Sequence, residues 1–260
     1  MTKTIKTNNS SRIVLKKKVN KNVTVIEGFP GIGFVGTIAA RYIVEELGME
    51  LVGHLESDKI PSVVIVHNSV PCSPIRIYAK DDLVVILSEL IIPHQFTYEL
   101  SKILVKWFKE IEAKEVVSMA GTSSESAPLK IIQGQPLKTA RRTVSGITTS
   151  AELNNKLTEL GVKIITEGTL AGTSSNVLLN CIEHDIPAAI LMVEANFVPD
   201  PLAAAPVLEV LNKHLKLGVN VKKLIEHGKK VEGQFKLIFE QLEKEKRKNK
   251  DMTMPSPMYG

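Results

Sequence analysis

The sequence has few cysteines, few aromatic residues and no long hydrophobic run. Its 260 residues include two cysteines, Cys72 and Cys181, which are too few for a disulfide scaffold or a cysteine-based zinc site. They fit a reducing compartment, so we expect a cytoplasmic protein. The longest apolar runs, at 83–87 and 188–193, are far shorter than the roughly 20 residues of a membrane-spanning helix. The N-terminus has no apolar core, so we expect neither a secretory signal nor a membrane partner.

The excess of positive over negative charge is also small. The chain has 33 basic and 28 acidic residues, a net charge of +5, and 43% of its residues are hydrophobic, a composition typical of a folded protein. Basic residues cluster at 16–21 and 244–250. Such clusters can bind nucleic acid, but aromatic residues are sparse near both. We interpret the clusters as solvated ends and expect no nucleic-acid partner.

Short β-branched runs alternate with helical periods along most of the chain. The pattern predicts strands at 23–27, 51–55, 62–67, 75–79, 83–87, 115–119, 162–165 and 188–193, and helices at 35–47, 96–111, 152–160, 175–184 and from 202 onward. This order favours an α/β fold with a largely parallel central sheet flanked by helices. The four strands between 51 and 87 lie too close together for intervening helices, so they should pair antiparallel and make the sheet mixed.

The domain organisation follows from the same pattern. We predict a flexible basic N-terminal segment at 1–20 and a single α/β domain at 21–235. A charged helix end and a flexible C-terminal tail occupy 236–260, where lysines and prolines dominate.

A glycine-rich turn joins the first predicted strand to the first helix. Gly31, Gly33 and Gly36 match the G-x-G-x-x-G pattern of dinucleotide-binding folds, and glutamates at 50 and 56 stand where a ribose-binding acid would. However, apolar residues at 29, 30, 32 and 34 crowd the loop, and no second βαβ unit follows. We therefore interpret the turn, with Gly28 included, as structural packing. A nucleotide-binding or nucleoside-processing enzyme that uses this turn stays open as the alternative.

Other candidates for chemistry are weaker. The string Gly-Thr-Ser-Ser occurs at 121–124 and again at 172–175, each time after a predicted strand. Its hydroxyl groups are suited to capping a helix or a turn, and such loops are also able to bind anions. The sequence has no G-x-S-x-G motif, and its six histidines show no metal-ligand spacing. We therefore predict no catalytic residue, no metal and no cofactor.

The C-terminus presents a distinct pattern. Pro255 and Pro257 forbid a helix and favour an extended segment. Met258, Tyr259 and Gly260 follow, so a hydrophobic group, a tyrosine and a free carboxylate stand at the end of a tether. This combination is suited to capture in a pocket of another protein. A frayed end without function is the equal alternative on physical grounds.

These residues together resemble the archaeal proteasome assembly chaperone family. The string at 28–36 is the most specific part, and the loop segments Ala120-Gly121-Thr122, 167–172 and Glu194-Ala195 are similar too. The resemblance covers roughly residues 20 to 215. In addition, the last three residues match the family's terminal motif of a hydrophobic residue, tyrosine and any residue.

The resemblance implies a non-enzymatic, ATP-independent chaperone that docks on the α-ring of the proteasome core particle. It also implies a fold like that of the nucleoside phosphorylases, without their catalytic residues. By the same resemblance, Met258 and Tyr259 enter pockets between adjacent α-subunits, and the carboxylate of Gly260 meets a lysine there. Met258 stands where the family often has a branched or longer aliphatic residue, so each tail should bind weakly. A homo-oligomer would compensate because several tails bind together.

Overall fold

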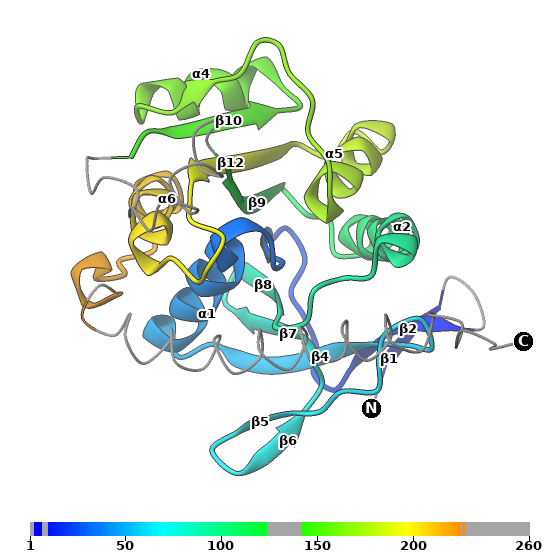
Figure 1. Ribbon diagram of the computed structural model, residues 1–260. Coiled ribbons are helices and arrows are strands. Elements are labelled where there is room, and N and C mark those ends of the chain that lie inside the picture. Colours follow the sequence, from blue (N-terminus) through cyan, green and yellow to red (C-terminus); the bar gives the residue numbers. More distant parts are fainter. Residues whose placement is uncertain (1–2, 7–9, 124–141, 225, 227–260) are drawn as a thin grey trace, which may run out of the picture.

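The computed structural model describes residues 3–6, 10–123, 142–224 and 226. At its centre is a ten-stranded sheet with the order β1-β2-β4-β7-β8-β3-β9-β12-β10-β11 (Figure 1). Its strands are β1 (Lys3–Lys6), β2 (Ser11–Leu15), β3 (Thr24–Gly28), β4 (Glu50–Ser57), β7 (Ile75–Lys80), β8 (Leu83–Ser88), β9 (Glu115–Thr122), β10 (Val144–Thr148), β11 (Lys163–Ile164) and β12 (Ala188–Glu194).

The middle of the sheet is parallel, and one side is an antiparallel meander. Strands β8, β3, β9 and β12 are parallel neighbours, whereas β2, β4, β7 and β8 pair antiparallel. On the other side, β10 runs antiparallel to β12, and β11 runs parallel to β10. Strand β8 is buried over its whole length, as expected for a strand that is covered on both faces. The predicted α/β class, with a mixed and largely parallel central sheet, is confirmed.

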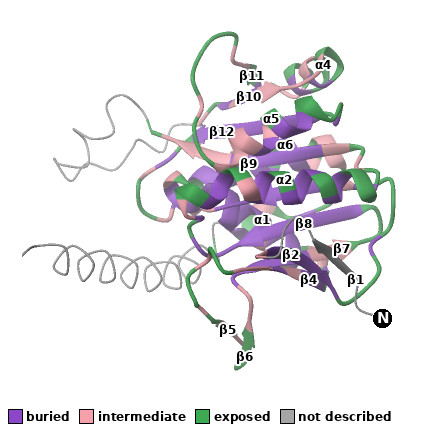
Figure 2. Cartoon of the chain, turned by 90° about the vertical axis from the view of Figure 1, so that its right-hand side faces the viewer, coloured by how far each residue is buried: buried purple, intermediate pink, exposed green. Residues whose placement is uncertain are grey.

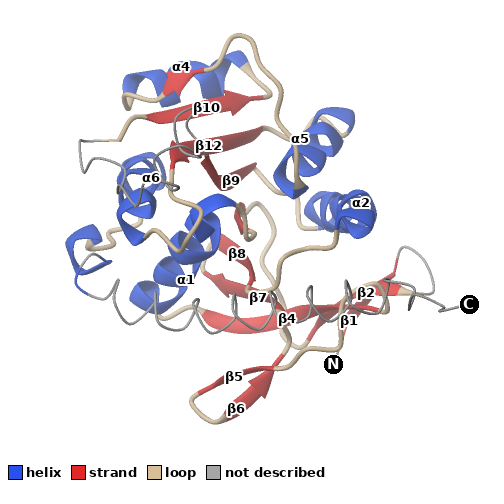
Figure 3. Cartoon of the chain, in the orientation of Figure 1, coloured by secondary structure: helices blue, strands red, loops and turns tan. Residues whose placement is uncertain are grey.

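Helices cover both faces of this sheet (Figure 3). One apolar layer packs under α1 (Val35–Leu47), α6 (Pro201–Leu215) and α4 (Ala151–Glu159), and the other under α2 (His94–Glu110) and α5 (Thr173–Glu183). Figure 2 shows the buried residues concentrated in the central strands and on the helix sides that face them. Apolar residues recur every three to four positions in α2, including the fully buried Phe96, Leu100 and Trp107, so one face of this helix closes the second layer.

A small two-stranded ribbon projects from the body of the protein (Figures 1 and 2). Its strands, β5 (Ile65–His67) and β6 (Val70–Cys72), pair antiparallel with each other. We call residues 60–74 the β5–β6 arm. The arm belongs to neither face of the main sheet, because its strands form a sheet of their own.

The N-terminal segment differs from our expectation of a flexible basic stretch at 1–20. Residues 3–6 and 11–15 form β1 and β2, and β2 extends the sheet by pairing with β4. Ile13 of β2 is fully buried. Lys17, from the expected basic cluster, forms an ion pair with Glu50. The predicted tail at 236–260 lies outside the described residues. Among those that are described, no helix combines the length and apolar character needed to cross a membrane.

Candidate functional site

The glycine-rich turn lies at the carboxyl edge of the parallel strands, between β3 and α1. The 3-10 helix η1 (Ile32–Phe34) connects the two elements. At Gly28, an added Cβ would lie 2.6 Å from the carbonyl oxygen of Gly36 and would also clash with Ala40. At Gly36, it would clash with the carbonyl oxygen of Met119 in β9 and lie 2.9 Å from that of Phe29. These two glycines therefore let α1 pack directly on the strands beneath it.

The other two glycines of the turn have different surroundings. Gly33 has a φ of +66°, a conformation that favours glycine, and an added Cβ would lie 2.7 Å from that of Ala195. Its carbonyl oxygen accepts a hydrogen bond from the Asp200 backbone N–H at 2.9 Å. Gly31, in contrast, has nothing within 4 Å of an added Cβ. Of the four glycines of the turn, only Gly31 faces open space.

The structure separates the turn from the acids that a dinucleotide site would need. Glu50 and Glu56 lie on β4, and the strand order places β7 and β8 between β4 and β3. Three strand spacings correspond to about 14 Å. Moreover, Glu56 is engaged by Arg12 and by His54 at 3.0 Å. The turn and these acids therefore do not form one site.

A buried carboxyl group, Glu27, directly precedes the turn. Its side chain is fully buried and accepts hydrogen bonds from the hydroxyl groups of Ser174, at 2.9 Å, and Ser118. Burial raises the pKa of Glu27 to about 7, although these hydrogen bonds and one from the Phe29 backbone oppose the shift. The nearby thiol of Cys181 has its pKa raised to about 12 by burial and by the charge of Glu27. An acidic group at this position disfavours a bound phosphate.

The two Gly-Thr-Ser-Ser strings have separate structural roles. Gly121 and Thr122 complete β9, whereas Gly172 precedes α5, whose first turn has no side-chain cap. The expected capping by the second string is therefore absent, and Ser174 binds Glu27 instead. Ser124 of the first string lies outside the described residues.

A second buried carboxylate, Glu89, joins four separate segments of the chain. It accepts hydrogen bonds from Arg76 of β7 at 2.6 Å, from Arg41 of α1 at 2.5 Å, and pairs with His67 of the arm at 2.8 Å. Burial alone would raise the pKa of Glu89, but Arg76, with His67 and Arg41, outweighs burial and holds that pKa below its usual range. Sequence reasoning missed this cluster, because its members are far apart in the chain.

Three of the histidines each pair with one carboxylate. His54, His67 and His214 pair with Glu56, Glu89 and Glu115, respectively. No group of three or more metal-ligating side chains is found in the part of the chain that the structure describes.

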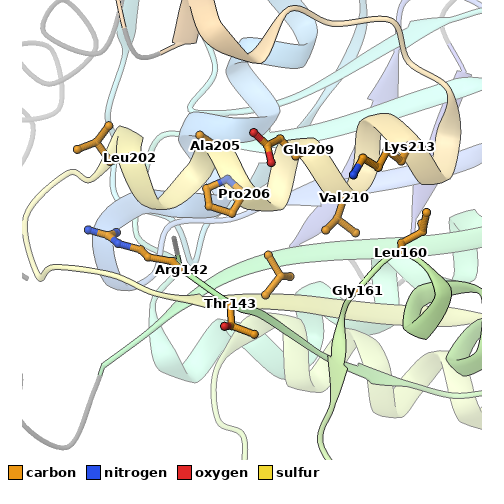
Figure 4. Close-up of a pocket in the computed structure, with 11 residues that line it drawn as sticks. Arg142, Thr143, Leu160, Gly161, Leu202, Ala205, Pro206, Glu209, Val210 and Lys213 are labelled. Carbon is orange, nitrogen blue, oxygen red and sulfur yellow. The ribbon is translucent and has the colours of Figure 1, made fainter. Parts of the chain in front are cut away.

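A groove of about 540 Å³ lies between α6 and β10 (Figure 4). Its lining combines apolar side chains, such as Val144, Leu202 and Pro206, with the charged side chains of Glu209 and Lys213. Arg142 lies at one end, where it forms a buried ion pair with Asp200 at 2.8 Å. Asp200 also caps the N-terminus of α6. The residues that line this groove include no paired acid and base and no activated nucleophile, so they do not form a catalytic set.

The predicted partner-binding residues Met258, Tyr259 and Gly260 lie outside the described residues. Their role stays a prediction.

Comparison with known proteins gives consistent matches over most of the chain. The model of the PAC2 family matches residues 25–238. The crystal structure of Pyrococcus furiosus PbaA, described as an archaeal homolog of proteasome-assembly chaperone, has a TM-score of 0.78 and 33% identity, and covers 90% of this chain and 99% of that one. A Thermoplasma acidophilum protein of unknown function has a TM-score of 0.77 and 29% identity, covering 89% and 91%. An uncharacterized Methanocaldococcus jannaschii protein is 33% identical over 234 residues, which are 89% of this chain and 92% of that protein.

Proposed function

The chain belongs to the PAC2 family, and from that premise we propose that it is an ATP-independent, non-enzymatic chaperone of the proteasome core particle, acting in the cytoplasm. The family resemblance inferred from the sequence is confirmed. The observation that carries the proposal is the whole-length likeness to PbaA, which is described as a homolog of proteasome-assembly chaperone.

We assign the contact with the core particle to the C-terminal tail. Met258 and Tyr259 would enter pockets between adjacent α-subunits, with the carboxylate of Gly260 against a lysine of the pocket. A tyrosine is suited to this role because its ring buries apolar area while its hydroxyl group can find a partner. A single short tail binds weakly, so a homo-oligomer that presents several tails gains affinity from their high effective concentration.

The geometry of the glycine turn supports a function other than catalysis. Protein atoms occupy the positions next to Gly28, Gly33 and Gly36, and the buried carboxyl group of Glu27 lies directly before the turn. A pyrophosphate needs open space and backbone N–H groups at this position. The nucleotide-enzyme alternative therefore receives no support from the described residues.

The proposal is tested by capture of archaeal proteasome core particles on the immobilised full-length chain. Tyr259→Ala should nearly abolish capture, because removal of an interface anchor costs about 1–3 kcal/mol at each tail. Tyr98→Ala is the matched control, since Tyr98 is 58% exposed on α2 and should leave capture unchanged. Melting temperatures of both variants should equal that of the parent. If Tyr259→Ala captures core particles as efficiently as the parent, the tail assignment is wrong.

A further inference from the structure

The β5–β6 arm is attached to the body of the protein by few contacts (Figure 1). No residue between 61 and 72 is buried, and β5 and β6 pair only with each other. Within the described residues, the hydrogen bonds from this stretch to the body come from the side chains of His67 and Cys72. A two-stranded ribbon without packing is at best marginally stable in water. The orientation of the arm therefore depends on these two side chains.

His67 is bonded through both of its ring nitrogens. Its Nε2 lies 2.8 Å from Oε2 of Glu89, and its Nδ1 lies 3.4 Å from Nη2 of Arg41. Burial alone would raise the pKa of Glu89, but its cationic partners hold that pKa below the usual range, so the carboxylate is ionised and only accepts hydrogen bonds. Nε2 therefore carries the hydrogen, and Nδ1 of the neutral ring accepts from Arg41. The neutral form of His67 satisfies both contacts.

A second proton on His67 would disrupt this arrangement. An imidazolium ring has an N–H group on each nitrogen and no acceptor, so its Nδ1–H group would face an N–H group of Arg41. The Nη2 of Arg76 also lies 3.3 Å from Nε2. The charged ring would thus gain one attraction, to Glu89, but would meet two guanidinium groups of its own sign. Protonation therefore weakens the contact between the arm and the body.

The two guanidinium groups are held in place and stay charged. Arg41 donates hydrogen bonds to Glu45 at 2.8 Å and to Glu89 at 2.5 Å. Arg76 is buried, and its Nε donates to the hydroxyl group of Tyr78 at 2.8 Å. Burial raises the pKa of Tyr78, so this hydroxyl group stays protonated near neutral pH, and a guanidinium group keeps its charge there. The repulsion is therefore relieved by movement of the arm.

We propose that the β5–β6 arm is a pH-sensitive strap, which neutral His67 fastens to the body and protonation of His67 releases. The remaining contact, in which the Sγ of Cys72 accepts a hydrogen bond from Arg76 at 2.9 Å, is weak because sulfur is a poor acceptor. Histidine changes its charge between about pH 5 and 8, so mild acid is sufficient for release. The inference rests on these contacts and is independent of the proposed function.

The test measures the distance between the tip of the arm and the body by pulsed electron paramagnetic resonance, from about pH 8 to about pH 5. The full-length chain carries spin labels at Ser69→Cys, in the arm, and at Gln95→Cys, on α2, both of which are exposed positions. Cys72→Ser removes the other accessible thiol and keeps an acceptor for Arg76, whereas Cys181 is buried. The ratio of released to attached arm should rise about tenfold for each pH unit below about 6.5, because release binds one proton.

Three variants in the labelled chain identify the group that responds to pH. His67→Gln keeps an N–H donor for Glu89 but binds no proton in this range, so its distances should stay those of the attached arm at every pH. His67→Ala loses the contacts with Glu89 and Arg41, so it should give the released distances already at about pH 8. His54→Gln is the matched control, because His54 also pairs with a glutamate, Glu56, at 3.0 Å. It should respond to pH as the parent does.

Several outcomes would overturn the inference. Distances in the parent that do not change with pH would do so, as would a pH response that persists in His67→Gln, because another group would then cause it. Distances of the attached arm in His67→Ala would show that other contacts hold the arm. An independent measurement uses the unsubstituted chain, in which the ¹⁵N chemical shifts of the neutral His67 ring should place the hydrogen on Nε2. A hydrogen on Nδ1 would contradict the proposed contact with Arg41.

Discussion

Gly36 and Gly31 belong to the same turn, yet the structure predicts opposite results when each is replaced by alanine. At Gly36, the added Cβ meets the carbonyl oxygens of Met119 and Phe29. These are backbone atoms of a strand and of the turn, so they cannot rotate away as a flexible side chain would. At Gly31, the space is open and the φ of −147° lies in the extended region that alanine adopts without strain.

The expected magnitudes follow from these two environments. Overpacking of a tight site costs about 1–3 kcal/mol, whereas alanine in a helix is favoured over glycine by up to about 1 kcal/mol. Gly36→Ala should therefore lower the free energy of unfolding by about 1–2 kcal/mol, which for a chain of this size corresponds to about 2–4 °C in Tm for each kcal/mol. Gly31→Ala should leave stability unchanged or raise it by about 0.4–1 kcal/mol, because alanine restricts the unfolded chain.

Thermal and urea unfolding of the parent and both variants measure this difference. The packing interpretation fails if Gly36→Ala unfolds at the same midpoint as the parent, or if Gly31→Ala loses as much stability as Gly36→Ala. A nucleotide site would give a different pattern. The parent would melt at a higher temperature when nucleotide is added, and both variants would lose that increase.

Three other predictions concern charge. The pKa of Glu27 is raised to about 7, so the folded protein retains a proton that the unfolded chain releases. The free energy of unfolding should therefore fall by roughly 3 kcal/mol between about pH 4.5 and pH 7. Glu27→Gln should remove this fall, so that the variant melts above the parent at pH 8 but at the same temperature as the parent at pH 5. Arg76→Met should lower the free energy of unfolding by about 3–5 kcal/mol at pH 7, since the buried Glu89 loses a partner. The pKa of Glu89 is held low in the fold, so the stabilisation of the parent by the ionised Glu89 should be lost as the pH falls below about 4.5. Urea titrations should show that Arg76→Met loses less of its free energy of unfolding over this acidic range than the parent does. Neutral substitutions at 246–248 should slow association with core particles at low salt more than at high salt, as stopped-flow mixing would show.

Elements that are buried on both faces or that carry one apolar stripe could be predicted from the sequence. The unbroken apolar run of β8 is typical of a strand that is buried on both faces. The apolar residues that recur every three to four positions in α2 are typical of a helix with one buried face. The antiparallel pairing of β4, β7 and β8 followed from the short spacing between them. These local signals were sufficient for the fold class.

Elements at the edges and the buried polar clusters could not be predicted in the same way. Strand β10 carries Ser145 and Gly146, which weaken its pattern, and β6 contains Pro71, which is usually excluded from strands. Strand β2 follows a polar stretch, and its pairing with β4 decides its conformation. Burial of Glu27 depends on the position of α5, which no local pattern indicates.

The packed turn changes what the glycine pattern means for this protein. A G-x-G-x-x-G spacing indicates positions where the backbone comes close to other atoms. The sequence alone does not say whether those atoms belong to a ligand or to another part of the chain. Here the neighbours of Gly36 are carbonyl oxygens of the protein itself. Function on our proposal therefore belongs to the C-terminal tail, outside the sheet. Tyr259 would set the affinity of each tail, and the number of copies in the homo-oligomer would set how many tails act together. Loss of the tyrosine ring should weaken capture of core particles but leave the mass and the melting temperature of the free protein unchanged.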